Sequence, residues 1–482
     1  MLNRRALLGA GGVTGAGALL TMIARMDGAS ARPAHHHGTA PASGPPLRTE
    51  PFAVRMPVPE VLRPKRSNHG GDLYELDIRP AEVEIVPGLR TPVLTYGGTF
   101  VGPTIRARRG RHALVRFRNT MGADANVHLH GGHVPPHSDG YPTDVIPHGG
   151  QRVYHYPNSQ QGATLWYHDH THHREAEHVY RGLHGFYLLE DEDERALRLP
   201  GGPYDVPVML SDAHLDASGA LVWNPFGGWF ERTTLLANGR PQPYFPVEAR
   251  RYRFRLLNAA THRHFRLDLD GEQMVQIASD GGLLPRPVAL TELVLSPGER
   301  AEVIVDFGRH RPGTRLVLSD VSGPVLRFDV ERHARDDSRV PDELRPAPAP
   351  LRSSVERHLV LSTDLAEVRS LINGRVFDAD RVDFRIRHGA TETWRISNAD
   401  TDPVAGHVDH NFHIHLVQFR VLDRDGRPPR PGEEGWKDTV VVPPGESVRV
   451  QATFRGYRGR YVHHCHILEH SQFGMMGQFE VV

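Results

Sequence analysis

The sequence predicts an all-β protein made of three tandem β-sandwich domains, and three observations support this. Alternating apolar and polar runs separated by Gly, Pro and Asp turns dominate the chain, and helical periodicity is almost absent. A strand that ends in asparagine recurs, at Asn119, Asn258 and Asn398. A glycine turn leading into an alternating run follows each copy, with spacings of 148 and 147 residues, at Gly150, Gly298 and Gly445. Such a repeat indicates three related domains.

The N-terminal residues 1–31 are predicted to be a signal peptide. Asn3-Arg4-Arg5 precedes a weakly apolar stretch over residues 6–24, and Ala29-Ser30-Ala31 offers a small-residue cleavage site. Twin arginines are typical of the route that exports folded proteins, so the mature protein is expected in the periplasm or outside the cell. Residues 32–68, rich in Pro, Ala and His, are predicted to be a disordered lead-in.

The three domains are predicted to cover residues 69–195, 200–333 and 355–482. A linker is expected over residues 334–354, where Pro, Arg and Asp dominate and periodicity vanishes. The formal net charge is zero, so no nucleic acid or acidic membrane surface is expected as a partner. No other apolar run reaches the length of a spanning helix, and the mature protein is expected to be a soluble monomer without a membrane anchor.

Cys465 is the single cysteine of the chain, and it lies within His464-Cys465-His466. Two imidazoles, one thiolate and a distant methionine are typical of an electron-transfer copper site. His470 and Met475 supply two of these four donors, and His410 has the offset expected for the second imidazole. On an extended strand, Cys465 faces opposite to its two histidine neighbours, so the tripeptide can serve two metal sites.

Three further His-x-His pairs occur in apolar or aromatic surroundings. The i, i+2 spacing on a strand places both rings on one face, which suits one metal or adjacent metals. Together with the pair around Cys465 they make eight imidazoles, too many for one copper and appropriate for a cluster of three. The additional pairs are His128 and His130, His168 and His170, and His413 and His415.

The repeat predicts where this cluster lies. The pairs fall after the asparagine and glycine elements of the first and third repeats, whereas the second repeat carries Leu-Asp-Leu-Asp and Leu-Val-Leu-Ser there. We therefore expect a cluster in the interface of the first and third domains, with the middle domain as a spacer and a wall of the substrate pocket. His262 and His264 have the spacing but no partner motif, so they are interpreted as structural, and Met476 as a core residue.

At this point the chain resembles three-domain multicopper oxidases from about Asp72 to its C-terminus. The resemblance is carried by residues 127–132, 165–170, 435–439 and 461–470, which look most like bacterial spore-coat laccases, with bilirubin oxidase and phenoxazinone synthase nearby. It implies three cupredoxin-like Greek-key β-sandwiches and four copper ions, one of type 1, one of type 2 and two of type 3. It also implies oxidation of a reductant in one-electron steps and reduction of dioxygen to water.

The family pattern also implies a role for each ligand position. Electrons are expected to enter through His470 or His410 and to pass through Cys465 to His464 and His466. The type 1 copper is implied on His410, Cys465, His470 and axial Met475; the type 2 copper on His128 and His413; and the type 3 pair on His130, His168, His170, His415, His464 and His466.

Proton supply is where the sequence departs from the family. Asp139 matches an acidic residue that the family uses near the cluster for proton delivery, although it can instead only orient a ligand histidine. The residue after the type 1 histidine is usually a glutamate in the bacterial laccase branch, and here it is Ser471, which cannot act as a carboxylic acid. Slower oxygen–oxygen cleavage, or supply by Asp139, Asp169 or a water chain, are the open alternatives.

The expected reductant is a small aromatic molecule, a phenol or aminophenol, with dioxygen as acceptor. Oxidation of cuprous or manganous ions is the alternative, and it is disfavoured because the nine methionines form no cluster beyond Met475-Met476. A copper-free scaffold is disfavoured by the complete ligand set, and a copper nitrite reductase by the three repeats. Further histidines in the first domain are interpreted as solvated, with a role in an access channel as the alternative; they are His133, His137, His148, His172, His173 and His178.

Overall fold

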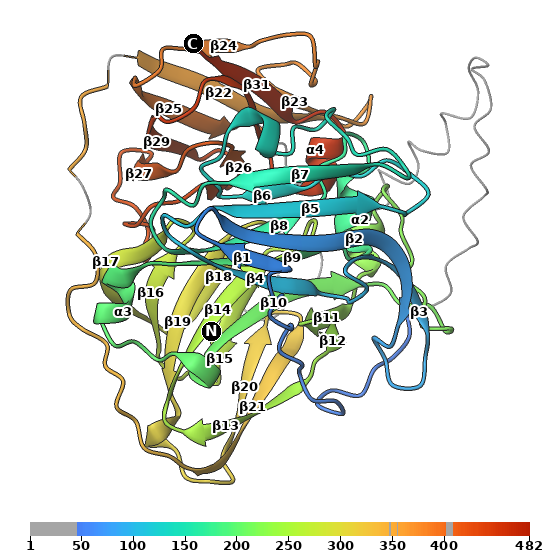
Figure 1. Cartoon of the computed structure of the whole chain (residues 1–482), viewed down its shortest axis with the longest axis vertical. Helices are drawn as coiled ribbons and strands as arrows, with labels where there is room; N and C mark the ends of the chain where they lie inside the picture. Colours follow the sequence, from blue (N-terminus) through green and yellow to red (C-terminus); the bar gives the residue numbers. More distant parts are fainter. Residues whose placement is uncertain (1–45, 347–348, 354, 402–407) are drawn as a thin grey trace, which may run out of the picture.

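The computed structural model describes residues 46–346, 349–353, 355–401 and 408–482, and these form three β-sandwich domains (Figure 1). The first domain contains η2 (Pro136–Ser138), α2 (Glu175–Tyr180), α3 (Glu192–Ala196) and the strands β1 (Arg66–Asn68), β2 (Gly71–Val83), β3 (Thr91–Tyr96), β4 (Gly102–Arg108), β5 (Ala113–Asn119), β6 (His128–His130), β7 (Gln151–Tyr156), β8 (Ala163–His168) and β9 (His184–Glu190). One sheet has the order β1-β2-β5-β7, with β3 on β2, and the other β4-β9-β8-β6.

The second domain contains η3 (Gly202–Tyr204), η4 (Gly228–Glu231), η5 (Phe307–Arg309) and the strands β10 (Asp205–Ala213), β11 (Thr234–Ala237), β12 (Arg240–Pro241), β13 (Tyr244–Ala249), β14 (Arg251–Asn258), β15 (Phe265–Leu269), β16 (Met274–Ser279), β17 (Gly282–Leu290), β18 (Glu292–Leu295), β19 (Arg300–Asp306), β20 (Arg315–Asp320) and β21 (Gly323–His333). Its sheets have the orders β12-β11-β10-β14-β19-β16-β17 and β13-β21-β20-β15-β18.

The third domain contains α4 (Leu468–Gln472) and the strands β22 (Val355–Asp364), β23 (Arg369–Ile372), β24 (Phe384–Ile386), β25 (Thr391–Asn398), β26 (His410–Ile414), β27 (Phe419–Arg424), β28 (Thr439–Val442), β29 (Ser447–Thr453), β30 (Gly459–His464) and β31 (Met476–Val481). Its sheets have the orders β23-β22-β25-β29-β27 and β24-β31-β30-β26-β28. The predicted all-β, cupredoxin-like architecture is thus confirmed.

Each domain has its own apolar core, because strand residues alternate between a buried and a more exposed face. In β5, for example, Val115 and Phe117 are buried and Arg116 and Arg118 face outward. In the second domain, Leu267 and Leu269 of β15 and the leucines of β20 join the core. The corresponding strand pairs of the other domains, β6 with β8 and β26 with β30, carry histidines instead.

The repeated asparagine and glycine form the same junction in all three domains. Asn258 accepts from Gly298 N–H through its main-chain oxygen, and Asn398 does the same for Gly445. In the first domain the glycine that donates to Asn119 is Gly149, not the Gly150 aligned from the sequence. All three donors have positive φ, at +78°, +85° and +74° in chain order, a conformation that favours glycine. The sequence alignment of the first repeat was therefore wrong by one residue.

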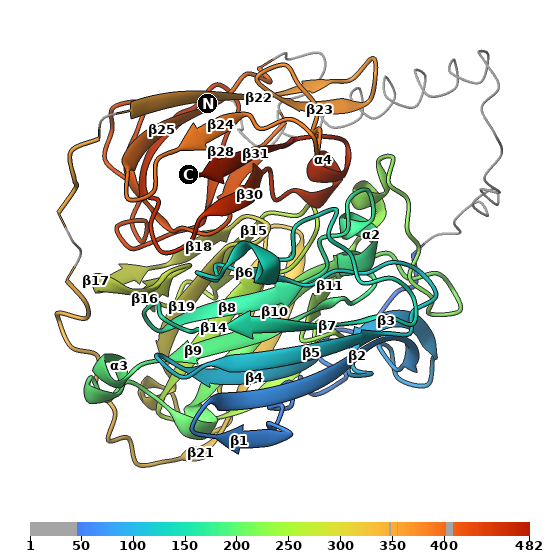
Figure 2. The same cartoon turned by 45° about the horizontal axis from the view of Figure 1, so that its top comes forward.

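The three domains enclose a common centre. In Figures 1 and 2 the third domain (orange to red) lies on the strands of the first (blue to green), with the second (green to yellow) beside both. Strand β8 of the first domain contacts β17 and β19 of the second, and α2 of the first domain contacts α4 of the third. Residues from all three domains therefore meet at the ends of β8, β26 and β30.

Residues 46–68 differ from the expected disordered lead-in. Leu47 N–H donates to Leu215, Arg55 and Val61 form bridges with Tyr244 and Thr104, and β1 pairs with β2. The physical reason is apolar burial, since Met56 is 1% exposed within the core of the second domain. Residues 1–45, with the predicted signal peptide and the start of the lead-in, lie outside the described residues.

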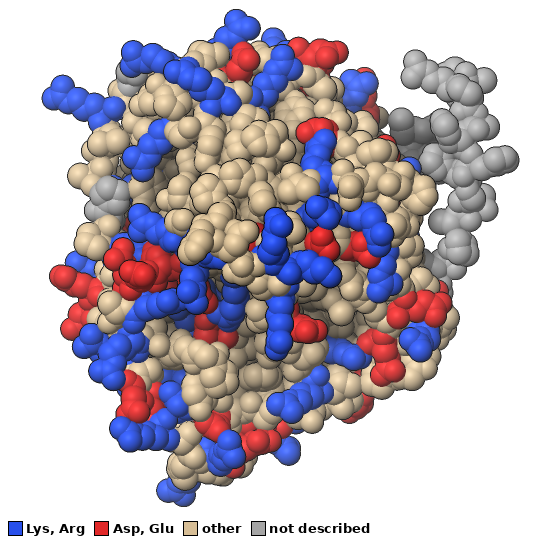
Figure 3. Space-filling view, viewed as in Figure 1, with Lys and Arg blue, Asp and Glu red and all other residues tan. Residues whose placement is uncertain are grey.

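The surface mixes charges of both signs. On the face of Figure 3, Lys and Arg side chains alternate with Asp and Glu side chains. In the described part of the chain, none of the helices combines the length and apolar character that crossing a bilayer requires.

Candidate metal centres

Eight histidines from the first and third domains converge in one buried cluster, called here the eight-histidine cluster. Each is at most 1% exposed. The two domains interlock through stacked rings, with centroids 3.7 Å apart for His128 and His415 and 3.8 Å apart for His130 and His413. The members are His128 and His130 on β6, His168 and His170 at and after the end of β8, His413 and His415 on and after β26, and His464 and His466 at and after the end of β30.

Main-chain carbonyl groups fix the orientation of half of these rings. The Nδ1 atoms of His128 and His413 lie 2.6 and 2.8 Å from the carbonyl oxygens of Asp139 and Asp438. Those of His168 and His464 lie 2.9 Å from the carbonyl oxygens of residues 169 and 465. A carbonyl oxygen can only accept, so Nδ1 carries the proton and Nε2 is left with a lone pair.

These lone pairs face the interior of the cluster, and several have no hydrogen-bond partner. Burial lowers the pKa of His168 to about 3 and that of His464 to about 4, so the rings are neutral near neutral pH. Neutral imidazoles with free lone pairs are the form that binds metal ions. The ring nitrogens without a partner are Nε2 of His128, His168 and His413, Nδ1 of His130 and His170, and both nitrogens of His466.

The donor atoms also have suitable spacing. Three groups of three histidines each bring one nitrogen per residue within 4.8 Å of the others. His128 and His413, the predicted type 2 ligands, share one of these groups with His415. His466 belongs to none of them, although its ring lies 4.7 Å from that of His130 between centroids. The remaining groups are His128 with His130 and His168, and His170 with His415 and His464. The donor set fits several copper ions held between two domains.

Two buried aspartates, Asp139 and Asp438, contact ring nitrogens of the eight-histidine cluster. Asp139 Oδ2 lies 2.7 Å from His415 Nδ1, so this residue contacts histidines of both domains. Burial raises the pKa of Asp139 well above its usual range. Asp438 Oδ1 lies 2.9 Å from His130 Nε2. Asp438 was not predicted as a functional residue, although it lies within the stretch 435–439 on which the resemblance depended.

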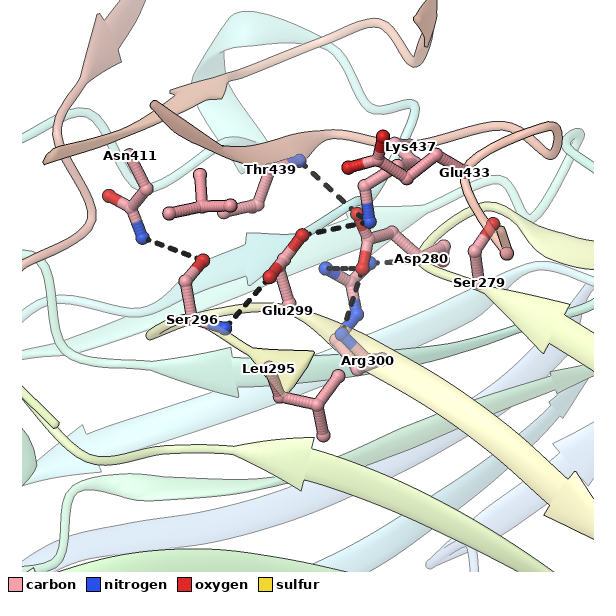
Figure 4. Close-up of polar contacts among 12 residues, drawn as sticks. Ser279, Asp280, Leu295, Ser296, Glu299, Arg300, Asn411, Glu433, Lys437 and Thr439 are labelled. Carbon is pink, nitrogen blue, oxygen red and sulfur yellow. Dashed lines mark hydrogen bonds and ion pairs between the residues drawn. The ribbon is translucent and has the colours of Figure 1, made fainter. Parts of the chain in front are cut away.

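The middle domain contributes to this cluster, which differs from its predicted role as a spacer and pocket wall. Arg300 donates to both oxygens of Asp438, at 2.7 and 2.6 Å. Lys437 forms ion pairs of 3.0 Å with Asp280 and Glu299 of the middle domain (Figure 4). Arg300, Asp280 and Asp438 are 0–1% exposed. A bidentate arginine from the second domain therefore positions the carboxylate of the third domain that contacts His130 of the first.

A smaller group of donors, called here the cysteine cluster, consists of His410, Cys465 and His470 in the third domain. Cys465 Sγ lies 3.7 Å from His470 Nδ1 and 4.0 Å from His410 Nδ1, and the two nitrogens are 3.1 Å apart. His410 Nε2 contacts Asp400 Oδ2 at 2.8 Å. Burial raises the pKa of the Cys465 thiol to about 12, so a bound cation is what would keep the thiolate here.

Met475 is held beside this cluster by its main chain. Its N–H donates to His470 and its carbonyl oxygen accepts from Cys465, and the side chain is 0% exposed. Met476 is likewise buried, in a small apolar cluster with Phe377 and Val462. The sequence interpretation of Met475 as a donor and Met476 as a core residue is compatible with these positions.

The cysteine cluster is closest to solvent at His470. His470 is 7% exposed, compared with 0% for His410 and Cys465. His262 of the middle domain lies edge-on to His470, with centroids 5.4 Å apart, and Trp229 stacks on His262 at 4.4 Å. Of the two predicted entry points for electrons, the geometry favours His470. The pair formed by His262 and His264 is in no close donor group among the described residues.

The two clusters are joined through the main chain. Cys465 follows β30 directly, and its peptide neighbours His464 and His466 belong to the eight-histidine cluster. Asn411 strengthens this junction because its Oδ1 accepts from the N–H groups of His466 and Ile467. The opposite orientation expected for Cys465 and its neighbours is therefore present in the structure.

The additional histidines of the first domain have different environments. His178 is 5% exposed and its Nδ1 lies 3.0 Å from Asp169 Oδ1, so its interpretation as solvated was wrong. Its sequence spacing carries no signal for this contact, which depends on how α2 folds back. His133 contacts the carbonyl oxygen of Leu416, whereas His148 and His173 are exposed.

Comparisons with known proteins agree with this arrangement. Three family models described as multicopper oxidase match residues 77–194, 205–318 and 349–482. A laccase of Bacillus subtilis is 34% identical, over 90% of this chain and 99% of its own length. A bilirubin oxidase of Albifimbria verrucaria is 34% identical, over 89% and 81%. The crystal structure of a laccase from Pediococcus acidilactici superposes with a TM-score of 0.84 at 32% identity, covering 91% of this chain and 96% of its own.

Proposed function

This chain belongs to the multicopper oxidase family, and we propose that its reductants are phenols and aminophenols. It is a laccase-like copper oxidoreductase that uses dioxygen and a reducing substrate, with type 1, type 2 and type 3 copper ions as its cofactors. The substrate class and the role of each residue are the proposed part.

We propose that the cysteine cluster, together with Met475, would hold the type 1 ion. The type 2 ion is assigned to His128 and His413, and the type 3 pair to the other six histidines of the eight-histidine cluster. The observation that carries this assignment is the set of buried ring nitrogens without a hydrogen-bond partner, supplied by two domains. When bound, copper supplies the one-electron redox chemistry for both half-reactions.

The protein itself supplies orientation, shielding and connection. Main-chain carbonyls and the carboxylates of Asp139, Asp400 and Asp438 fix the donor atoms of the rings. Complete burial keeps bulk water from the eight-histidine cluster. Asp139 lies against histidines of both domains, which supports a role in moving protons there. Cys465 provides the shortest covalent path from one cluster to the other.

An aromatic surface beside His470 supports an aromatic reductant. His262 contacts His470 and Trp229 stacks on the His262 ring, and Phe226, which is 51% exposed, stacks on Phe473 with centroids 5.6 Å apart. Phe230 is 70% exposed next to Trp229. Flat phenols and aminophenols can stack on such side chains with the reacting group toward His470. Oxidation of cuprous or manganous ions is the second candidate, and no methionine-rich segment favours it.

The first experiment is copper loading of the purified protein with metal analysis, a visible spectrum and oxygen uptake. Four coppers per chain, a blue thiolate band and uptake faster with a dimethoxyphenol than with Cu⁺ or Mn²⁺ are expected. The Cys465→Ser variant should lose the blue band and keep the other coppers. Faster uptake with a metal ion would replace the substrate proposal, and a copper-free protein would indicate a scaffold.

Export by the twin-arginine route is also proposed, from residues 1–31 that lie outside the described structure. Replacing both arginines, Arg4→Lys with Arg5→Lys, should leave the protein in the cytoplasmic fraction, and unchanged export would exclude the route. The proposed monomeric state is checked by light scattering on the purified chain.

A further inference from the structure

Ser471 occupies a position at which the resembling enzymes usually have a glutamate. It follows His470 in α4 and is 0% exposed. A hydroxyl group passes a proton on only when a partner supplies one, because its own acidity is too low near neutral pH. The environment of Ser471 therefore decides whether this position still takes part in proton supply.

The structure places a carboxyl group from another domain on Ser471. Glu175, the first residue of α2, accepts a hydrogen bond from Ser471 Oγ through Oε1 at 3.1 Å. Its other oxygen accepts from the Arg174 N–H at 3.1 Å. Glu175 is 0% exposed, and Ala176, Val179 and Leu468 seal the contact between α2 and α4, which lie together in Figures 1 and 2.

The charges around Glu175 keep its carboxyl group able to hold a proton. Burial raises the pKa of Glu175 to about 7, and Asp169 adds to this with its negative charge. Two neighbouring charged or titratable side chains on α2 and α4 form ion pairs with partners other than Glu175. Glu469 of α4 pairs with Arg232 at 2.9 Å, and His178 of α2 pairs with Asp169. None of them forms an ion pair with Glu175 among the described residues.

Asp169 is less suitable as the proton donor. Its carboxylate accepts from the N–H groups of Asn126 and Thr171 and from the Thr171 hydroxyl, and it also contacts His178. These contacts occupy both of its carboxylate oxygens, and none of them is with Ser471. Asp139 remains a separate candidate, and it contacts His415.

We propose that Glu175 supplies, through the hydroxyl of Ser471, the protonated carboxyl group that position 471 lacks. Reduction of one dioxygen to two water molecules consumes four protons and four electrons, and the electrons come from four one-electron oxidations of the reductant. In each relay, Glu175 donates its proton to Ser471 Oγ while the hydroxyl proton moves toward the eight-histidine cluster. The carboxylate then takes a replacement proton from solvent.

A hollow on the surface lies beside the two segments that contain Glu175 and Ser471. It has a volume of about 460 Å³ and is lined by His172, His173, Gln472 and Phe473, which flank Glu175 and Ser471 in the sequence. His173 Nδ1 contacts the carbonyl oxygen of Gln472 at 3.2 Å and links the two segments. Glu175 acts through Ser471 and does not touch the reacting atoms. It is therefore a positioning residue, which holds a proton and passes it to Ser471.

The first test uses the copper-free protein and needs no activity. Infrared spectra of the wild type should show a protonated carboxyl band that disappears with a midpoint near pH 7, and Glu175→Gln should remove it. Glu177→Gln, on the same helix with a side chain in an Arg181 ion pair, is the matched control and should retain the band. Persistence in Glu175→Gln of the component with a midpoint near pH 7 would overturn the proposal; a band from other buried carboxyl groups with a raised pKa, such as Asp139, is common to all three proteins.

The second test separates the two half-reactions of the copper-loaded enzyme, and it rests on the proposed function. Bleaching of the blue band by a phenol without oxygen should be as fast in Glu175→Gln as in the wild type. Return of the band on mixing with oxygen should slow by about a hundredfold, the usual size of a lost proton relay. The slowing of the wild type above pH 7 should be absent from the variant.

An exchange variant provides the rescue. Glu175→Ser should be slow like Glu175→Gln, and adding Ser471→Glu returns the carboxyl group to the position used by the resembling enzymes, so reoxidation should recover. Unchanged reoxidation in Glu175→Gln and Glu175→Ser would overturn the proposal. A wild type without a blue band would instead refute the proposed function, so the two failures are distinguishable.

Discussion

The eight-histidine cluster and the cysteine cluster lie one peptide bond apart but depend on the fold in different ways. The eight-histidine cluster takes its histidines from the first and third domains. Arg300 of the middle domain positions Asp438 against this cluster. The cysteine cluster takes all its close donors from one domain. The middle-domain residue that contacts His470, His262, has a half-buried side chain.

The eight-histidine cluster therefore depends on the assembly of the domains, whereas the cysteine cluster depends on the folding of the third β-sandwich. Disturbing the contacts between domains should therefore affect the eight-histidine cluster first. The blue band reports on the cysteine cluster and the remaining coppers on the other, so the two responses can be measured in the same sample.

Loss of Arg300 should have the largest effect. In Arg300→Met the buried carboxyl group of Asp438 loses its bidentate ion-pair partner, and breaking a buried ion pair in this way costs about 3–5 kcal/mol of unfolding free energy. Denaturant unfolding measures this cost, and the folded fraction should lose copper other than type 1 while keeping its blue band. The control is Arg118→Met, whose bidentate pair with Asp77 is exposed to solvent, so the unfolding free energy should be nearly unchanged. Loss of the blue band in proportion to the loss of the other coppers would contradict the expected difference between the two clusters.

The next largest effect is expected from the protonation of Glu175, which should make the unfolding free energy depend on pH. Its folded pKa lies above the ordinary value of 4.5, so the folded state holds its proton more tightly than the unfolded chain. Stability from this group is fully present below about pH 4.5 and is lost as the pH rises through about 7, for about 3 kcal/mol in all.

Denaturation of the copper-free protein between pH 4 and 8 measures this loss. The wild type should lose stability relative to Glu175→Gln over that interval, with Glu177→Gln following the wild type. A constant difference between the wild type and Glu175→Gln would show that the Glu175 proton is not linked to folding.

Gly298→Ala adds a single methyl group next to the eight-histidine cluster and tests how tightly this cluster is packed. A Cβ atom there would lie 2.9 Å from the His466 ring, and its φ is +85°. Gly149 has φ +78° with nothing within 4 Å, so Gly149→Ala carries the backbone strain alone, about 1 kcal/mol. Gly298→Ala should cost about 1–3 kcal/mol more and disturb the type 3 spectrum without shifting the blue band. Equal effects of the two substitutions would argue against close packing at His466.

Met475→Leu should have the smallest effect and should act on the cysteine cluster alone. Removing an axial sulfur destabilises the oxidised ion, so the type 1 reduction potential should rise. A tenfold change in the one-electron equilibrium corresponds to about 59 mV, or about 1.4 kcal/mol, and we expect a rise of this order. A redox titration without a rise would exclude Met475 as the axial donor.

Much of the site could be predicted because metal ligation leaves a strong sequence pattern. His-x-His on a strand and the tripeptide around Cys465 place donors by local geometry, and the repeat assigns them to the first and third domains. The groups that position those donors leave no such pattern. Asp400, Asp438 and Arg300 are ordinary charged residues in the sequence, and their contacts join positions that are up to hundreds of residues apart.

By itself, the sequence of this protein determined the sandwich class, the three repeats and the set of histidines and the cysteine proposed as metal donors, since each depends on short-range periodicity and spacing. Only the tertiary structure decided that Gly149 is the repeat equivalent of Gly298 and that residues 46–68 pack on the domains. It also decided that the middle domain positions Asp438 through Arg300 and that Glu175 faces Ser471. The physical reason is that these features depend on long-range packing and on buried charges that must find partners, which no local pattern records.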